Sequence, residues 1–326
     1  MANHGAGYSA GILALLGFCT LVAAADGLNV PADSADPQSP AKVVAVSQAL
    51  HQRFKHADGF YKKAVDAGGI WIMSSQKVDD RALLEVRYLI LSVLKGWPDV
   101  REAMVAKNVR IGVMSHDEFT TDIPEHRRLS PWWNMRARGL GGNPVTCGAE
   151  NILNYKGDPY RGENILIHEF AHVVAKFGLR EVDKTFGARL QTIFDKAKTS
   201  GLFQGYGITS RGEFWAEGVQ SWFECNTGGL ILKKDAKGKR KPLLNRADLK
   251  EHLPDLARLL ADSLGKNNWL YTTTDKRLDM PHLKGYDRDK APQFKWPKHI
   301  VEAARADQKR INARKKEREK KKREKK

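Results

Sequence analysis

The first 25 residues lack charge almost completely. Residues 10–25, AGILALLGFCTLVAAA, contain no charged side chain and end in small residues before Asp26. This apolar run is short for a membrane span and is typical of the central region of a signal peptide. The preceding segment also lacks Lys and Arg, so an uncleaved amphipathic or anchoring segment is the alternative. We expect residues 1–25 to be an export signal and the mature protein to be secreted or periplasmic.

Cysteine is scarce, with three in 326 residues, and removal of the predicted signal would take Cys19 with it. The remaining pair is Cys147 and Cys225. Two cysteines in an oxidising compartment tend to pair, and closing a loop of this length could contribute on the order of 4–5 kcal/mol. We favour a disulfide between Cys147 and Cys225, with two buried thiols as the alternative.

The basic segment at residues 314–326 contains no aromatic residues, which would be needed to stack on nucleic-acid bases. Residues 314–326, RKKEREKKKREKK, contain ten Lys or Arg and three Glu, and so supply +7 of the net charge of +17. Such a segment has no apolar stripe to bury and should be a solvated helix or disordered. It could attract an anionic polymer or surface, but we expect no specific nucleic-acid recognition.

The rest of the sequence contains no internal repeat. Residues 26–40 are rich in Pro, Asp and Ser and indicate a linker, residues 41–300 indicate a single domain, and residues 301–326 form the basic tail. Hydrophobic residues make up 41% of the chain, which is enough for a sizeable core. Apolar spacing predicts strands over 69–75, 109–115 and 147–155, and helices over 41–66, 79–95, 98–107, 163–177, 181–198, 212–223 and 247–264. This mixture predicts an α+β fold.

Residues 116–146 lack a periodic pattern. Their GLGG segment also lacks the lysine and the spacing of a phosphate-binding loop, so it indicates a turn. Two aromatic residues, Trp132 and Trp133, stand beside Arg136 and Arg138. They could form a peptide-binding wall, or the tryptophans could pack a long loop onto the core, which is the interpretation we favour.

The segment ILIHEFAHVVAKF carries the strongest chemical signal. His168 and His172 are four residues apart in a helical pattern, so both imidazoles lie on one face and can bind one Zn²⁺. Glu169 lies between them, where it can take a proton from a water molecule at the open position of the ion. The apolar flanks bury the helix, as a rigid platform for ligands requires.

A catalytic zinc site needs a third protein ligand, and no third histidine follows at the spacing of HExxHxxGxxH. The segment GEFWAEGVQSWF offers two carboxylates on an apolar helix, which are costly to bury unless paired or bound to metal. We expect Glu213 to be the third ligand and Glu217 to accept the N–H of a ligating histidine, namely His168. The alternative is that one or both carboxylates face solvent.

HEFAH followed by EFWAE resembles the glutamate-zincin superfamily, and within it the catalytic domain of anthrax lethal factor and the MtfA-like peptidases. The resemblance covers about residues 147–225. It implies a zincin-like metallopeptidase fold, with a small mixed sheet, an active-site HExxH helix and a second helix that carries a ligand. It also implies that Glu213 is the metal ligand and that Tyr206, seven residues earlier, stabilises the oxyanion. A surface tyrosine is the alternative for Tyr206. The helix after Glu217 departs from those families.

The function expected from these residues is zinc-dependent hydrolysis of peptide bonds in a peptide or protein substrate by a monomeric enzyme. A strand before the HExxH helix should pair with extended substrate. The alternative is a non-catalytic metal-containing protein attached to an anionic polymer or cell surface by its basic tail.

Overall fold

A computed structural model of the protein describes residues 35–55, 59–265 and 267–323. The predicted signal peptide and most of the predicted linker lie outside these residues. Within the described ranges, no helix is both long enough and apolar enough to cross a membrane.

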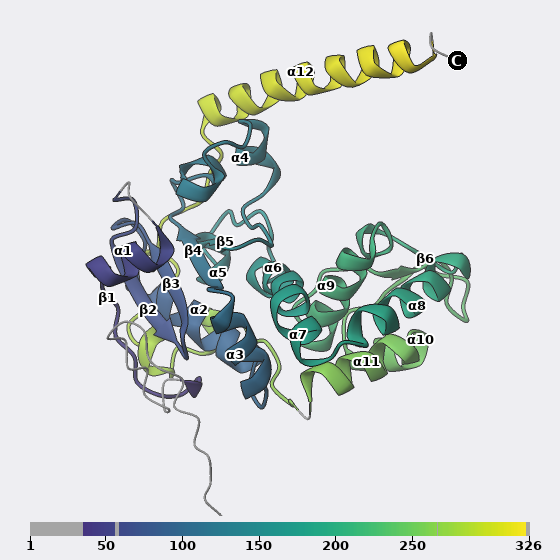
Figure 1. The fold of residues 1–326 in the computed structure, drawn as a ribbon, viewed down its shortest axis with the longest axis horizontal. Helices are drawn as coiled ribbons and strands as arrows, with labels where there is room; N and C mark the ends of the chain where they lie inside the picture. Colours follow the sequence, from purple (N-terminus) through teal and green to yellow (C-terminus); the bar gives the residue numbers. More distant parts are fainter. Residues whose placement is uncertain (1–34, 56–58, 266, 324–326) are drawn as a thin grey trace, which may run out of the picture.

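Five strands form a mixed sheet in the order β1-β2-β3-β4-β5 (Figure 1). The first three run antiparallel, and β3, β4 and β5 run parallel. A tight turn joins β2 to β3, where the Asp66 carboxylate accepts the N–H groups of Gly68 and Gly69 at 3.1 and 2.9 Å. Both glycines have positive φ, which other residues seldom adopt. The strands are β1 Val44–Ala45, β2 Lys63–Ala67, β3 Ile70–Ser74, β4 Arg110–Met114 and β5 Val145–Gly148.

Helices pack on this sheet and extend to one side of it (Figure 1). Helices α2 and α3 form the crossover between the parallel strands β3 and β4. A group of helices that includes α6, α8, α9 and α11 packs beside the sheet. Three short strands cover part of this group of helices: β6 Phe203–Gln204, β7 Ile231–Leu232 and β8 Lys241–Pro242. The α-helices are α1 Gln48–Phe54, α2 Asp80–Val93, α3 Pro98–Ala106, α4 Trp132–Arg136, α5 Ala149–Ile152, α6 Ile165–Val173, α7 Arg180–Val182, α8 Phe186–Thr199, α9 Arg211–Trp222, α10 Arg246–His252, α11 Pro254–Leu264 and α12 Lys298–Arg323. Single-turn helices are η2 Thr120–Asp122, η3 Pro124–His126, η5 Tyr206–Ile208, η6 Thr274–Lys276 and η7 Pro281–Leu283.

The predicted α+β class is confirmed, as are the strands near 70–74 and 110–114 and the helices near 80–93, 98–106 and 211–222. Of the helix predicted over 41–66, only Gln48–Phe54 is helical among the residues that the structure describes. Lys63–Ala67 is instead a strand in which Val65 pairs with Ile72 of β3. Pairing with a neighbouring strand decides such a segment, and local apolar spacing does not reveal it.

Other predicted boundaries also differ, among them that of the helix expected over 181–198, whose main part, α8, begins only at Phe186. The strand expected over 147–155 ends at Gly148, where α5 begins. The expected stop at Gly178 does not occur, because α6 continues through the π-helix η4, Val174–Leu179. A Cβ at Gly178 would lie 2.6 Å from Val100 Cγ1, so the glycine permits close packing on α3. The single helix expected over 247–264 is divided at Pro254, which begins α11.

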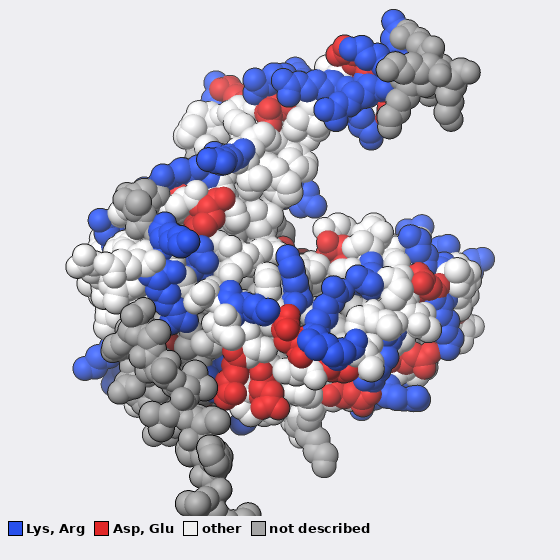
Figure 2. Space-filling model, viewed as in Figure 1, with Lys and Arg blue, Asp and Glu red and all other residues white. Residues whose placement is uncertain are grey.

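The basic tail is helical as far as Arg323, and it projects from the body of the molecule (Figure 1). Figure 2 shows Lys and Arg side chains along this projecting helix. Its first turns pack against the body on one side, because Ala304 is fully buried and the Asp307 carboxylate accepts the backbone N–H of Trp132 at 3.3 Å. The exposed part of α12 therefore begins after Gln308 and not at residue 301.

Candidate metal centre

Helix α6 places the two histidines of HEFAH on one face. The side chain of Asn164 caps the helix by accepting the N–H of Ile167 at 3.0 Å. Because His168 and His172 are one turn apart, their ring centroids lie 5.1 Å from each other. His168 is buried and His172 is partly exposed, so the pair lies at the edge of the core.

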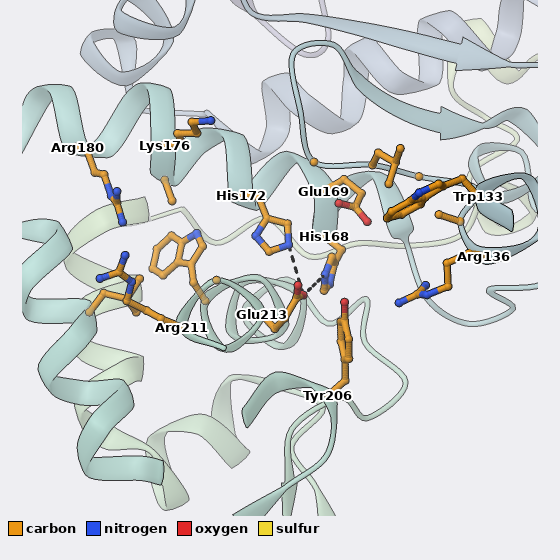
Figure 3. A pocket seen from close by; sticks show the side chains of 18 residues that line it. Trp133, Arg136, His168, Glu169, His172, Lys176, Arg180, Tyr206, Arg211 and Glu213 are labelled. Atoms are coloured by element: carbon orange, nitrogen blue, oxygen red, sulfur yellow. Dashed lines mark hydrogen bonds and ion pairs between the residues drawn. The ribbon is translucent and has the colours of Figure 1, made fainter. Parts of the chain in front are cut away.

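Helix α9 brings Glu213 to the same point. Ser210 caps this helix, and Trp215 Nε1 donates to the carbonyl of Ala171 at 3.0 Å, which ties α9 to α6. Oε2 of Glu213 lies 3.0 Å from Nε2 of His168 and 3.5 Å from Nε2 of His172. One ligand atom from each of the three side chains lies within 4.8 Å of the others. Figure 3 shows the three side chains pointing toward one another.

A hydrogen bond to Gln220 determines the tautomer of His168. The Nε2 amide group of Gln220 donates to the carbonyl of Asn164 and to the carboxylate of Glu163, both at 3.1 Å. Its Oε1 therefore faces Nδ1 of His168, at 2.8 Å, and accepts the Nδ1–H. The lone pair of Nε2 is left to face Glu213 and His172, as a metal ligand requires.

Glu217 does not take the role predicted for it. Its Oε1 lies 4.0 Å from Nδ1 of His168, beyond hydrogen-bond distance, and its Oε2 accepts the side-chain N–H of Asn226 at 2.7 Å. Gln220 takes that role because it is seven residues after Glu213, or two turns along the same face of α9. The sequence contains that spacing, but only the packing of α9 on α6 decides that Gln220, and not Glu217, accepts the Nδ1–H of His168.

The charges at the centre attract a cation. Burial lowers the pKa of His168, but its hydrogen bonds with Glu213 and Gln220 and the nearby charges of Glu169 and Glu217 together outweigh this and raise the pKa to about 9. Burial also opposes ionisation of Glu213, yet its contacts with His168 and His172 hold its pKa well below the usual range. Two imidazole nitrogens and an ionised carboxylate converge here, and a proton or a metal ion can satisfy them.

Glu169 is directed into the cavity beside this cluster (Figure 3). Burial raises the pKa of its carboxyl group, and the nearby His168 and His172 oppose that shift. Gly141 lies so close that a Cβ there would be 2.9 Å from Glu169 Oε2 and 3.0 Å from His172 Cδ2. A glycine at this position therefore leaves room for Glu169.

Tyr206 lies at the mouth of the cavity and is 45% exposed. Its ring stacks on that of His168, with centroids 6.2 Å apart and an angle of 29°. Burial raises the pKa of its phenol, and the hydroxyl interacts with Glu213 and Arg136. The structure thus places Tyr206 beside the cluster.

The cavity in front of the cluster has a volume of about 520 Å³, and an adjoining lobe has a volume of about 370 Å³. The segment 139–142 borders both, and Leu140 pairs with Thr146 of β5 in an antiparallel bridge. Trp133 and Arg136 line the larger lobe, as a peptide-binding wall would. Arg138 instead is fully buried and forms a bidentate ion pair with Glu150 at 2.6 and 2.9 Å. This pair fixes the loop that precedes Gly139.

The disulfide favoured from the sequence is not formed. Cys147 and Cys225 are both free and buried, and burial raises the pKa of each thiol. Cys147 belongs to β5, and Cys225 follows α9, where its N–H donates to the carbonyl of Gln220 at 2.9 Å. The structure contains two buried thiols, which is the alternative given for the sequence.

Comparisons with known proteins add no family assignment. The sequence matches no protein-family model, and no curated protein matches it significantly.

Proposed function

We propose that this protein is a zinc-dependent peptidase with a zincin-like arrangement of its site. The observation that carries the proposal is the convergence of His168, His172 and Glu213 within 4.8 Å, with Glu169 directed into the same cavity. Two helices from distant parts of the sequence produce this convergence, and the resemblance to glutamate-zincins supports the same assignment.

The three side chains suit Zn²⁺ by their chemistry. Two neutral imidazole nitrogens and one carboxylate are a donor set that zinc takes when a fourth position serves catalysis. His168 is held in the required tautomer by Gln220 at 2.8 Å. When bound, Zn²⁺ would supply a Lewis acid that polarises a peptide carbonyl and makes a nearby water molecule more acidic.

The protein side chains account for the proton transfers. Glu169 accepts the proton of the attacking water and delivers it to the leaving amine, and a carboxyl group with a raised pKa suits both steps. The hydroxyl of Tyr206 donates a hydrogen bond to the oxyanion that forms on the carbonyl oxygen. Its position beside His168 and Glu213 is consistent with that donation.

The segment 139–142 is the substrate-binding edge in this proposal, rather than β5 itself. Leu140 directs both of its backbone groups to Thr146, at 3.0 and 3.3 Å. Gly139, which precedes Leu140, borders both lobes of the cleft, and the backbone N–H of Gly141 interacts with the carboxylate of Glu169. An extended peptide can therefore add to this edge beside Glu169.

The test is metal analysis of purified protein together with cleavage of a mixed peptide pool. His168→Ala should lose both zinc and activity. Glu169→Gln should keep zinc and lose activity by roughly 10²–10⁴-fold, because only the proton acceptor is removed. Full turnover in Glu169→Gln would refute the mechanism, and purified protein without zinc would refute the metal assignment.

A second candidate is a metal-containing binding protein that attaches to an anionic polymer through α12. The exposed Lys and Arg residues of this helix favour it. Because the helix is packed as far as Asp307, the informative truncation ends at Gln308. Peptidase activity should survive this truncation, whereas salt-sensitive binding to heparin or anionic vesicles should disappear. Loss of peptide cleavage on truncation would contradict the assignment of catalysis to α6 and α9.

We also propose that the mature protein is secreted or periplasmic and monomeric. The uncharged residues 10–25 motivate the first statement. Amino-terminal sequencing of exported protein should begin at Asp26, and light scattering should give the mass of one chain. An intact Met1 on the exported protein, or a dimer mass, would contradict the respective statement.

A further inference from the structure

Three basic side chains gather at one end of the larger lobe of the cleft. Lys176 comes from η4, Arg180 begins α7 and Arg211 begins α9, and all three line the cavity that contains His172. Figure 3 shows them on the side of His172 away from Trp133 and Arg136. Three separate elements therefore direct positive charge to one end of the site.

These cations are not neutralised by the protein as described. Over residues 35–55, 59–265 and 267–323, none of the three forms an ion pair with a carboxylate. Arg211 donates instead to the neutral side-chain oxygen of Gln191 at 2.7 Å, and the ammonium of Lys176 lies 4.9 Å from the ring centre of Phe177. Like charges that share a cavity repel one another, and an anionic ligand relieves that repulsion.

The opposite end of the cleft has the other sign of charge. The adjoining lobe, which shares His168, Glu169 and Tyr206 with the first, is bordered by Glu163 and Glu217, while Arg136 lines both lobes. A carboxylate of a ligand is thus favoured in the larger lobe, called the basic lobe below, and disfavoured in the adjoining lobe, called the acidic lobe. Glu169 lies between the two lobes. A ligand that spans the centre meets this gradient of charge along its length.

The substrate-binding edge gives the direction of the chain. Gly139 borders both lobes, whereas Gly141 borders only the basic lobe. The segment 139–142 therefore runs from the acidic lobe toward the basic lobe. A peptide that pairs antiparallel with it, as β5 does on its other side, has its amino-terminal part in the basic lobe.

The helix that carries the histidines gives the spacing. Lys176 and Arg180 are four and eight residues after His172, which corresponds to at most about 6 and 12 Å, because 1.5 Å per residue is the rise of an α-helix and Val174–Leu179 form a more tightly stacked π-helix. An extended peptide covers these distances in about two to four residues at roughly 3.3 Å each.

We propose that the substrates are peptides with an Asp or Glu side chain two to four residues on the amino-terminal side of the cleaved bond, bound by Lys176, Arg180 and Arg211. This inference rests on the proposed peptidase function and names its substrate class. The guanidinium groups of Arg180 and Arg211 bind a carboxylate by charge-assisted hydrogen bonds, which a glutamine side chain cannot replace.

The experiment compares peptides that differ only by Glu or Gln at these positions, with amidated carboxyl termini so that the only added carboxylate is the side chain. With the zinc-loaded full chain, kcat/KM should be on the order of tenfold higher for the Glu peptides. The inactive variant Glu169→Gln gives a second measurement, because fluorescence anisotropy should show the same preference in Kd without cleavage. Added salt should reduce the preference.

A matched pair of variants assigns the effect to the cleft. Arg180→Gln/Arg211→Gln should abolish the preference for Glu, whereas Lys237→Gln/Lys276→Gln, with the same change of charge at exposed sites outside the cavity, should keep it. Equal Kd values for the Glu and Gln peptides would overturn the inference. Failure of the peptidase proposal would show separately, as absence of zinc and of cleavage.

Discussion

The side-chain oxygen of Gln220 accepts the Nδ1–H of His168 at 2.8 Å, and this bond orients the histidine toward Glu213. The amide itself is held by Asn164 and Glu163, each 3.1 Å from its Nε2. A fully buried residue that does not line the cavity thus determines which nitrogen of His168 is available to a metal ion.

Loss of this acceptor should weaken metal binding. We expect Gln220→Ala to lower zinc affinity roughly 10–100-fold, because His168 would lose the partner that fixes its tautomer. Competition with a chromophoric chelator measures the affinity. Glu217→Gln is the control, since Glu217 lies 4.0 Å from Nδ1 of His168, and it should keep affinity near that of the natural protein. An equal loss in both variants would contradict the assignment of this role to Gln220.

A side chain at position 141 should disturb the site without unfolding the protein. The added methyl group in Gly141→Ala would lie 2.9 Å from Glu169 Oε2 and 3.0 Å from His172 Cδ2, so both side chains must shift. We expect kcat/KM to fall on the order of tenfold or more, with little change in melting temperature.

The adjacent glycine provides a matched control. A Cβ at Gly142 would meet its nearest neighbour, the carbonyl oxygen of Pro144, at 3.4 Å, which is close to ordinary contact. Gly142→Ala should therefore retain most of the activity. If both substitutions reduce kcat/KM equally, crowding of Glu169 is not the cause.

Stability should depend on pH through Asp158. Burial raises the pKa of this carboxyl group to about 6, although N–H groups of Tyr160 and Asn151 oppose the shift. An unfolded chain titrates near 3.9, so the folded state binds the proton more tightly. The stability that this proton supplies is complete below about pH 4 and is lost as the pH rises through about 6. The loss is on the order of 2–3 kcal/mol.

Denaturant unfolding between pH 4 and pH 6.5 measures this effect. The free energy of unfolding should decline less over that interval in Asp158→Asn than in the natural protein. Asp279→Asn, at an exposed position, should leave the change of the unfolding free energy with pH the same as in the natural protein. Identical slopes for all three proteins would show that Asp158 titrates at its ordinary pKa.

Both cysteines should be recovered as thiols. Alkylation of the denatured protein without reductant should label Cys147 and Cys225, because both are free in the fold. In the native protein labelling should be slow, since both side chains are buried and burial raises the pKa of each. Mass spectrometry of tryptic peptides measures both results, and a peptide pair joined through these cysteines would contradict them.

The candidate ligands could be predicted because their spacing is a property of a single helix. His168 and His172 share a face wherever that helix lies, and so do Glu213 and Glu217. Their apolar flanks indicated burial, and the α+β class followed from the alternation of apolar patterns. The segment 63–67 was misassigned because its conformation depends on the pairing with β3.

The sequence by itself determined the two helices, the residue types of the cluster and the glutamate between the histidines, because each of these depends on short-range periodicity. Only the tertiary structure decided which polar side chain of α9 meets His168, because that depends on the rotation of one helix against another. It also decided that Gly141 contacts Glu169 and that Arg211 of α9 shares one end of the cleft with Lys176 and Arg180. Contacts of this kind join residues far apart in the chain, and no local pattern encodes their distances.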